Sequence, residues 1–438
     1  MAKIIDTQRS SRRYSTTNLW IGLIAALLLL AILLESICLG ILYVNDSLTG
    51  RSTNAFARTH LLTRLFEPAE PNPVSGKKFL GTFPLDEGQW AQFLVADGLL
   101  GWRLAADISF FYAPDPPNKY HYVTDDNGFI ADVDDPPVAL QKSLDAFRVI
   151  ILGGSTVMGN GAPRPSQNIV GMLRKAVRER GLTGPNGRRI EFINAGVLGY
   201  NSAQEYLYLV SDLLRFKPDL VVAYDGWNDS EYDFNDNFSP FRTKTHVETQ
   251  RHITRSYSIA GSVFLVAQNL KTFFTSSNFK LGMIELPWRV FNKLRSKADS
   301  VHSSSTPFDP RNIEFYDINR RAFLALADDH LSVALFLQPM VGVDDRPLSA
   351  EEQASWWYPK LDEAMRNRVP FYEHARHILA DLKVRDQGNG HHCIADLSHS
   401  LKGVSEPVYA DTAHLLPKGN EVVAAHILDQ LVLCGLLR

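Results

Sequence analysis

The chain has few cysteines and no excess of basic residues, and both shortages limit what it can be. Its 438 residues include only Cys38, Cys393 and Cys434, which excludes a small disulfide-stapled scaffold. The formal net charge is -3, so we expect no nucleic-acid partner, because such proteins usually carry a basic excess. The Cys and His spacing of a zinc site is also missing, and we expect no metal and no cofactor.

Two of the three cysteines lie near the C-terminus. Cys393 begins an expected strand and Cys434 ends the last expected helix. A disulfide between them requires an oxidising compartment, and two free buried thiols are the alternative. The sequence leaves both alternatives open.

What the chain does contain is one long apolar run. Residues 19–44 are almost wholly apolar, and a helix of this length spans a bilayer core of about 30 Å. Residues 1–18 carry four basic side chains, Lys3, Arg9, Arg12 and Arg13. By the positive-inside rule this tail is cytoplasmic, which predicts a single-pass anchor with the rest of the chain outside the cytoplasm. A bacterial inner membrane with the main domain facing the periplasm fits this topology.

The anchor has one alternative and one unusual residue. A cleaved signal peptide is the alternative, but the sequence from Glu35 to Cys38 is a poor cleavage site. Glu35 also places a carboxyl within the apolar run, where it is either protonated, close to the outer interface, or in contact with a membrane protein partner.

Composition divides the remainder of the chain. Residues 45–74 are polar and mixed and indicate a connector. Residues 75–145 form an accessory segment rich in aromatic residues, in which the turn signal at 125–128 favours short strands or a hairpin. Residues 146–438 are expected to form one catalytic domain, interrupted by an insertion at 230–310.

Apolar strands and amphipathic helices alternate within residues 146–438. Strands are expected at 147–152, 190–194, 219–224, 332–337 and 393–397. Helices are expected at 166–181, 202–216, 313–329, 354–384 with a break at Pro370, and 417–433. Residues 202–205 form a capping box, which supports a helix start at Ser202. Such alternation predicts an α/β fold with a parallel sheet covered on both faces, whose ligands bind beyond the carboxyl ends of the strands.

Four short motifs fall at that edge of the expected sheet. They are Gly153-Gly154-Ser155-Thr156, residues 194–199, Gly226-Trp227-Asn228-Asp229 and Asp411-Thr412-Ala413-His414. Each is weak alone, since glycine and asparagine are common in turns. A phosphate loop is the alternative for the glycine-rich motif, but the lysine of that pattern is missing. Together they contain a nucleophile, oxyanion donors, a base and an orienting carboxylate, the groups that acyl transfer needs.

At these residues the chain resembles the SGNH or GDSL-type hydrolases, from about Phe147 to Leu433 with a long interruption after Asn228. The resemblance implies a flavodoxin-like three-layer α/β/α fold with a central parallel sheet, here preceded by one N-terminal transmembrane helix. It implies Ser155 as the nucleophile, His414 as the base and Asp411 as its orienting acid. An oxyanion hole would come from the N–H groups of Ser155 and Gly199 and the amide of Asn228. Gly154 departs from the family pattern, which usually has Asp there.

The resulting prediction is a membrane-anchored serine ester hydrolase acting on O-acyl substrates outside the cytoplasm. An O-acyltransferase, such as an O-acetyltransferase that modifies a cell-envelope or exopolysaccharide glycan, would use the same residues. A non-catalytic glycan-binding or scaffold protein is the third alternative, and the intact Ser155, Asp411 and His414 argue against it. For the insertion at 230–310 we weigh a lid over the substrate pocket, a helix packed on the core, and a helix on the membrane surface.

Overall fold

A computed structural model provides the structure of the protein. It describes residues 16–48, 76–83, 93–112, 119–132, 135, 137–231, 309–366, 368–386 and 389–438. The connector predicted at 45–74 and the insertion predicted at 230–310 lie almost wholly outside the described residues. The chain divides into two units, of which the described part of the first is the N-terminal helix, and each unit is described by itself.

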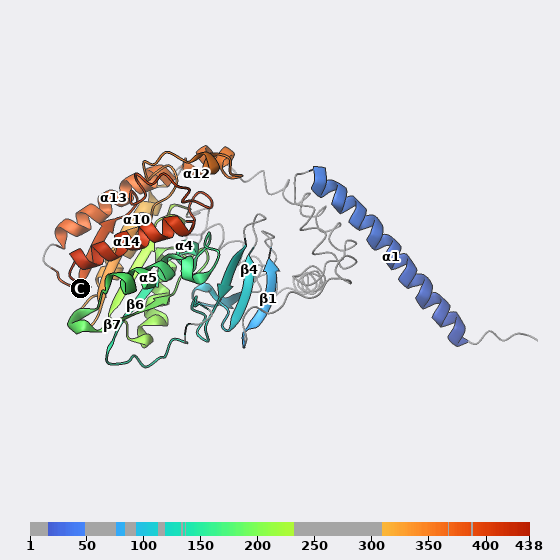
Figure 1. Cartoon of the computed structure of the whole chain (residues 1–438), viewed down its shortest axis with the longest axis horizontal. Helices are drawn as coiled ribbons and strands as arrows, with labels where there is room; N and C mark the ends of the chain where they lie inside the picture. The colour runs from blue at the N-terminus through green and yellow to red at the C-terminus, as the bar shows by residue number, and fades with distance from the viewer. Residues whose placement is uncertain are drawn as a thin grey trace, which may run out of the picture. The chain divides into compact units, whose positions relative to one another are not determined.

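The N-terminal unit contains helix α1 (Thr16–Leu48), drawn in blue in Figure 1. Its segment Leu23–Asn45 has a mean hydropathy of 2.7 and is long and apolar enough to cross a membrane. Most of its large apolar side chains are exposed, as for Leu29 at 68%. The expected apolar helix is therefore present, while its insertion and its orientation stay predictions.

The second unit is organised around a parallel five-stranded sheet. In spatial order its strands are β7 (Arg189–Asn194), β6 (Ala146–Leu152), β8 (Leu220–Asp225), β9 (Ser332–Leu337) and β10 (His392–Asp396). Every residue of β6 is buried, as its run of aliphatic side chains predicts for a central strand. Numbered along the chain the order is 2-1-3-4-5, the flavodoxin-like order, which reverses between β6 and β8. The predicted fold class is confirmed.

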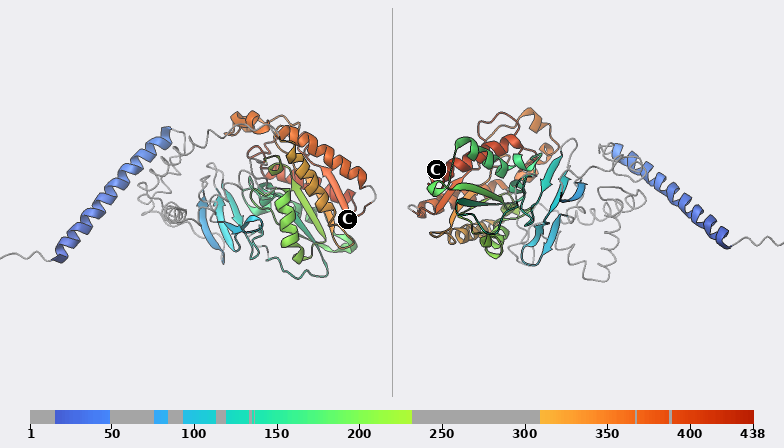
Figure 2. Two further views of the ribbon diagram at one scale, coloured as in Figure 1. Left: turned by 180° about the vertical axis from the view of Figure 1, so that it is seen from behind. Right: turned by 60° about the horizontal axis from the view of Figure 1, so that its bottom comes forward.

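Helices cover both faces of this sheet. The helices α5 (Ile169–Arg180) and α14 (Pro417–Leu433) pack together on one face (Figure 1), and α6 (Ser202–Ser211), α10 (Arg311–Leu324) and α13 (Arg368–Arg385) lie on the other, seen from behind in Figure 2. Because strand side chains alternate, Val149 and Ile151 join the core under α5 and α14, whereas Ile150 and Leu152 join the core under α6 and α10.

Short helices fill the connections. They are α4 (Ser155–Met158), η2 (Pro165–Gln167), η3 (Pro185–Gly187), η4 (Leu213–Phe216), η5 (Asn228–Glu231), α11 (Ala350–Gln353), η7 (Tyr358–Lys360) and α12 (Leu361–Met365). The helix expected at 354–384 is thus several pieces. Pro370 does not break it but lies in the first turn of α13, where a missing N–H removes no helical hydrogen bond.

The start of α6 also corrects an expectation. The helix begins at Ser202, but its N-cap is Asn201, whose side chain accepts two backbone hydrogen bonds at 3.1 Å each. The hydroxyl of Ser202 donates instead to Asp229, in the motif that follows β8. The predicted capping box is therefore wrong, because a tertiary partner takes the Ser202 side chain.

The accessory segment folds into short strands. They are β1 (Lys78–Phe83), β2 (Leu94–Asp97), β3 (Gly101–Leu104), β4 (Ile108–Tyr112) and β5 (Tyr120–Val123). Strands β2 and β3 form an antiparallel hairpin, and β1, β4 and β5 form a three-stranded sheet. Its aromatic residues stack, with the Phe110 ring 4.5 Å from Phe93 and 5.0 Å from Tyr122, and they share the core under α6.

Candidate active site

The candidate nucleophile stands at the carboxyl end of the central strand. Strand β6 ends at Leu152, two glycines follow, and α4 begins at Ser155, which is 8% exposed. The Oγ atom of Ser155 lies 2.7 Å from Nε2 of His414, a residue 259 positions further along the chain. Sheet order thus brings two of the predicted residues into contact.

The candidate base is itself held by the predicted carboxylate. Nδ1 of His414 lies 2.6 Å from Oδ2 of Asp411, while Oδ1 of Asp411 accepts the backbone N–H groups of Ala413 and His414, at 2.9 Å each. With the proton on Nδ1, the imidazole donates to Asp411 and accepts the hydroxyl proton of Ser155. Burial alone would raise the pKa of Asp411, but the charge of His414 and these hydrogen bonds outweigh it and lower that pKa.

The predicted oxyanion residues come from the two neighbouring strands. Asn228 begins η5 just after β8, and its Nδ2 donates to the backbone oxygen of Tyr200 at 2.7 Å. Gly199, which precedes Tyr200, has a φ of 73°, in the left-handed region that favours glycine. The Gly199 turn and Asn228 are therefore linked through Tyr200, although the donation of the Gly199 N–H to an oxyanion stays a prediction.

Gly154 explains its own departure from the resembled family. A Cβ atom on Gly154 would lie 2.3 Å from Nδ2 of Asn228 and 3.0 Å from the oxygen of Tyr200. Real Cβ atoms essentially never show the first distance, and the second is tighter than nine in ten of their contacts. The amide of Asn228 thus occupies space that any side chain at residue 154, including Asp, would need.

Two buried side chains within the motifs hold the loops, and sequence analysis gave them no role. Asn194 donates through Nδ2 to the Val157 oxygen at 2.8 Å and thereby ties the end of β7 to α4. Asp229 accepts from the backbone N–H and the hydroxyl of Ser202, and Asn319 of α10 donates to that hydroxyl at 2.8 Å. The signal was present, since Asn194 and Asp229 stand inside two of the four motifs.

The accessory hairpin also supports the Gly199 turn. Nε1 of the fully buried Trp102 donates to the oxygen of Leu198 at 2.8 Å, and the Tyr200 hydroxyl donates to the oxygen of Trp102. Gln204 donates to the oxygen of Leu100 at 2.8 Å. Nothing in the local sequence around Trp102 indicates this partner, because the contact joins residues nearly a hundred positions apart.

A buried charged cluster lies at the end of β8, just before the motif that contains Asn228. Nη1 of Arg320 is 2.5 Å from Oδ2 of Asp225, at the end of β8, and Glu205 of α6 lies beside them with no exposed surface. Burial, and then the charge of Asp225, raises the pKa of Glu205 well above its usual value. Burial, with a contribution from Asp229 and against the opposing charge of Arg320, raises the pKa of Asp225 to about 7.

Cys393 and Cys434 are joined by a disulfide, with their Cα atoms 5.6 Å apart. This decides between the two alternatives that the sequence left open. The bond ties β10 to the end of α14, the helix that begins directly after the His414 loop. Among the described residues, no group of three or more His, Cys, Asp or Glu side chains is arranged to hold a metal ion, and the expectation of no metal and no cofactor stays a prediction.

Comparison with known proteins finds similar solved structures but no matching protein family. No family model matches the chain, and no curated protein matches it. Matching solved structures include a lipase/acylhydrolase from Enterococcus faecalis, with 14% identity over 66% of this chain and 97% of that chain and a TM-score of 0.35. An acetyl xylan esterase from Geobacillus stearothermophilus matches with 10% identity over 67% of this chain and 97% of that chain, with a TM-score of 0.34. A two-domain esterase active on acetylated mannans matches with 14% identity over 66% of this chain and 50% of that chain, with a TM-score of 0.32. At such low identities and TM-scores we draw no functional argument from them.

Proposed function

We propose that the chain is a membrane-anchored serine ester hydrolase that acts on O-acyl esters outside the cytoplasm. One observation supports this above the others: Asp411, His414 and Ser155 form a continuous hydrogen-bonded series, with distances of 2.6 and 2.7 Å, beyond the carboxyl end of β6. A serine hydroxyl in contact with an imidazole that a carboxylate orients is the arrangement that activates serine as a nucleophile.

The geometry supports a two-step reaction. The Oγ atom of Ser155 attacks the ester carbonyl carbon, and its proton passes to Nε2 of His414, while Asp411 stabilises the imidazolium. The carbonyl oxygen becomes an oxyanion, which the N–H groups of Ser155 and Gly199 and the amide of Asn228 stabilise. His414 then returns the proton to the departing alcohol, and an acyl-serine remains.

Water completes the reaction in a hydrolase. His414 takes a proton from the water as its oxygen attacks the acyl carbon, and then returns that proton to Oγ of Ser155 as the free acid leaves. In the second candidate function, an O-acyltransferase of a cell-envelope glycan, a sugar hydroxyl replaces this water. The apolar helix α1 favours this candidate, because an anchor would keep the site next to membrane-bound partners and acylated glycans.

The proposal is tested on the full-length protein in detergent, with p-nitrophenyl acetate and with a fluorophosphonate label. Ser155→Ala is expected to lower kcat by at least about 1000-fold and to abolish labelling, whereas Ser405→Ala, at an exposed serine, leaves both unchanged. A wild-type protein that neither reacts with the label nor hydrolyses the ester would support the non-catalytic glycan-binding alternative.

A second measurement separates hydrolysis from transfer. Mass spectrometry follows the acyl group on Ser155 after incubation with an acyl donor, with and without an oligosaccharide. Release as the free acid in both samples supports the hydrolase. Appearance of the acyl group on the sugar supports the O-acyltransferase.

A further inference from the structure

The candidate base and its carboxylate stand at the tip of a narrow loop. Tyr409 and Leu415 form an isolated antiparallel bridge, and the N–H of Ala410 donates to the His414 oxygen at 2.8 Å. Asp411 and His414 therefore lie within the hairpin that this bridge closes. Whatever fixes the base of the hairpin also fixes the position of the imidazole relative to Ser155.

A single buried carboxylate binds the base of this hairpin. Glu352 of α11 is 1% exposed, and its Oε1 accepts the N–H of Val408 at 3.0 Å and the N–H of Tyr409 at 3.1 Å. The same oxygen accepts Nη2 of Arg346 at 2.5 Å, and Oε2 accepts the N–H of Ser349 at 2.8 Å. Glu352 thus connects two consecutive amides of the catalytic loop to a buried cation.

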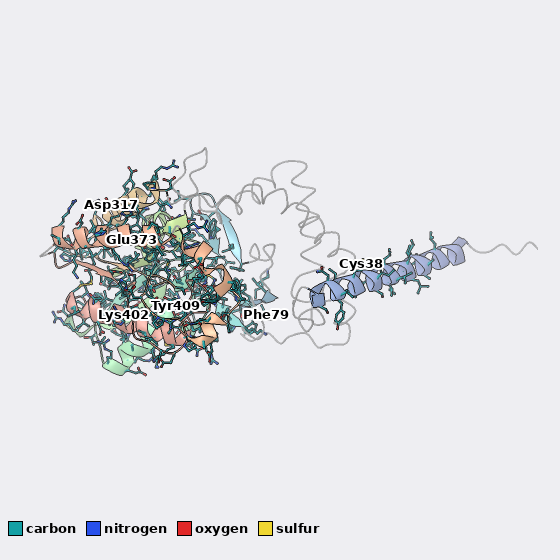
Figure 3. All side chains as sticks on the ribbon, turned by 90° about the horizontal axis from the view of Figure 1, so that it is seen from above. Cys38, Phe79, Asp317, Glu373, Lys402 and Tyr409 are labelled. Carbon is teal, nitrogen blue, oxygen red and sulfur yellow. A yellow bond between two sulfur atoms is a disulfide. The ribbon has the colours of Figure 1, made fainter. Side chains whose placement is uncertain are left out.

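A second carboxylate holds the side chain of the same tyrosine. The hydroxyl of Tyr409 donates to Oδ2 of Asp344 at 2.8 Å, and both residues are almost fully buried. Figure 3 labels Tyr409 within the packed body of the domain. The guanidinium of Arg346 lies 5.5 Å from the centre of the Tyr409 ring. Tyr409, which stands just before Asp411 in the loop, is therefore held by its backbone and by its hydroxyl.

The charge state of Glu352 suits this role. Burial alone would raise its pKa, but the hydrogen bonds from Arg346 and from the backbone amides bring that pKa below its usual value. The ionised carboxylate accepts strong hydrogen bonds from the loop. Its loss would leave the buried charge of Arg346 and two buried amides without this acceptor.

We propose that Glu352, together with Arg346 and Asp344, positions the His414–Asp411 loop against Ser155. This inference rests on the proposed function, because it assigns a role within that site. The three residues lie between β9 and α12, in a stretch where sequence analysis placed no functional residue. Their hydrogen bonds go to the loop and to one another, and they act on Ser155 and His414 only through the loop, so they are positioning residues.

The test compares Glu352→Leu and Glu352→Gln in the full-length protein. Misplacing a catalytic group by about 1 Å can cost about 100-fold in rate, so Glu352→Leu is expected to lower kcat by about 100-fold while KM changes little. The rate of fluorophosphonate labelling of Ser155 should fall in proportion. Glu352→Gln keeps an oxygen that accepts from the loop amides, and it is expected to recover most of the loss.

Glu191→Leu is the matched control. This substitution removes the carboxylate that lies 2.8 Å from Nε of Arg148, whose guanidinium is as deeply buried as that of Arg346. Glu191, however, lies near the amino ends of β6 and β7. This control should lower the unfolding midpoint and leave kcat at the wild-type level. An equal loss of kcat in Glu191→Leu and Glu352→Leu would overturn the proposal, because it would show a general effect of stability.

Tyr409→Phe is the second variant. If Glu352→Leu does not fold, Tyr409→Phe removes only the hydroxyl that Asp344 accepts, and about a 10-fold loss of kcat at unchanged KM is expected. Wild-type kcat in every variant that folds would overturn the inference while leaving the proposed function intact. Failure of the proposed function is distinct, because the wild-type protein would then behave like Ser155→Ala.

Discussion

Gly154→Ala tests, with a single added methyl group, whether the amide of Asn228 serves as an oxyanion donor. The backbone at Gly154 has a φ of -81°, which lies outside the left-handed region that favours glycine. The methyl carbon would lie 2.3 Å from Nδ2 of Asn228, and van der Waals contact requires the amide to retreat by about 1 Å. The change therefore acts mainly on Asn228, and to a smaller extent on the Tyr200 oxygen, which lies 3.0 Å from the added carbon.

The expected magnitude follows from this displacement. A retreat of about 1 Å would break the 2.7 Å hydrogen bond from Asn228 to the Tyr200 oxygen and move the amide away from the oxyanion. Loss of one oxyanion donor costs about 100- to 1000-fold in kcat, or roughly 2.7 to 4 kcal/mol. Gly154→Asp, which installs the usual residue of the resembled family, should lose at least as much.

The assay is a double-mutant cycle on kcat for p-nitrophenyl acetate. Asn228→Ala alone is expected to lose about the same factor as Gly154→Ala. The double variant should lose little more than either, because the shortest of the close contacts disappears with the amide. Gly390→Ala is the control, since no neighbour lies within 4 Å of its added carbon. Additive losses in the double variant, or wild-type kcat in Gly154→Ala, would refute the reasoning.

The remaining predictions concern stability. Because burial and then the charge of Asp225 raise the pKa of Glu205 in the folded protein, the unfolded carboxyl ionises first, and the free energy of unfolding falls as the pH rises above 4.5 towards the folded pKa. Urea unfolding of Glu205→Gln should therefore depend less on pH above 4.5 than that of the wild type, and parallel curves would contradict this. Cys434→Ala opens a disulfide with a sequence separation of 41 and should cost about 2 to 4 kcal/mol of unfolding free energy. Reductant should lower the wild type to the same level and leave the variant unchanged, and an unaltered unfolding midpoint would show that Cys393 and Cys434 are not bonded.

Much of the core can be predicted from the sequence, because the strands and helices that form it follow from the local pattern of apolar residues. The largely apolar run at 147–152 predicts a strand buried on both faces, and β6 is such a strand. The run at 19–44 predicts an apolar helix, and α1 is one. Helix ends are less predictable, because tertiary partners decide which side chain caps the helix. The hydroxyl of Ser202, for example, donates to Asp229 and does not cap α6.

The sequence by itself determined the strands of the sheet and most of its helices, and it predicted four motifs as the candidate site, because periodicity and residue type act over a few neighbouring positions. Only the tertiary structure decided which of these motifs meet. The contact of His414 with Ser155 depends on the strand order, which places distant loops at one edge of the sheet. The need for glycine at Gly154, the pairing of Cys393 with Cys434 and the support of the loop by Glu352 depend on packing between distant segments. Local propensity carries no information about such distances, and for that reason sequence analysis could not assign these roles.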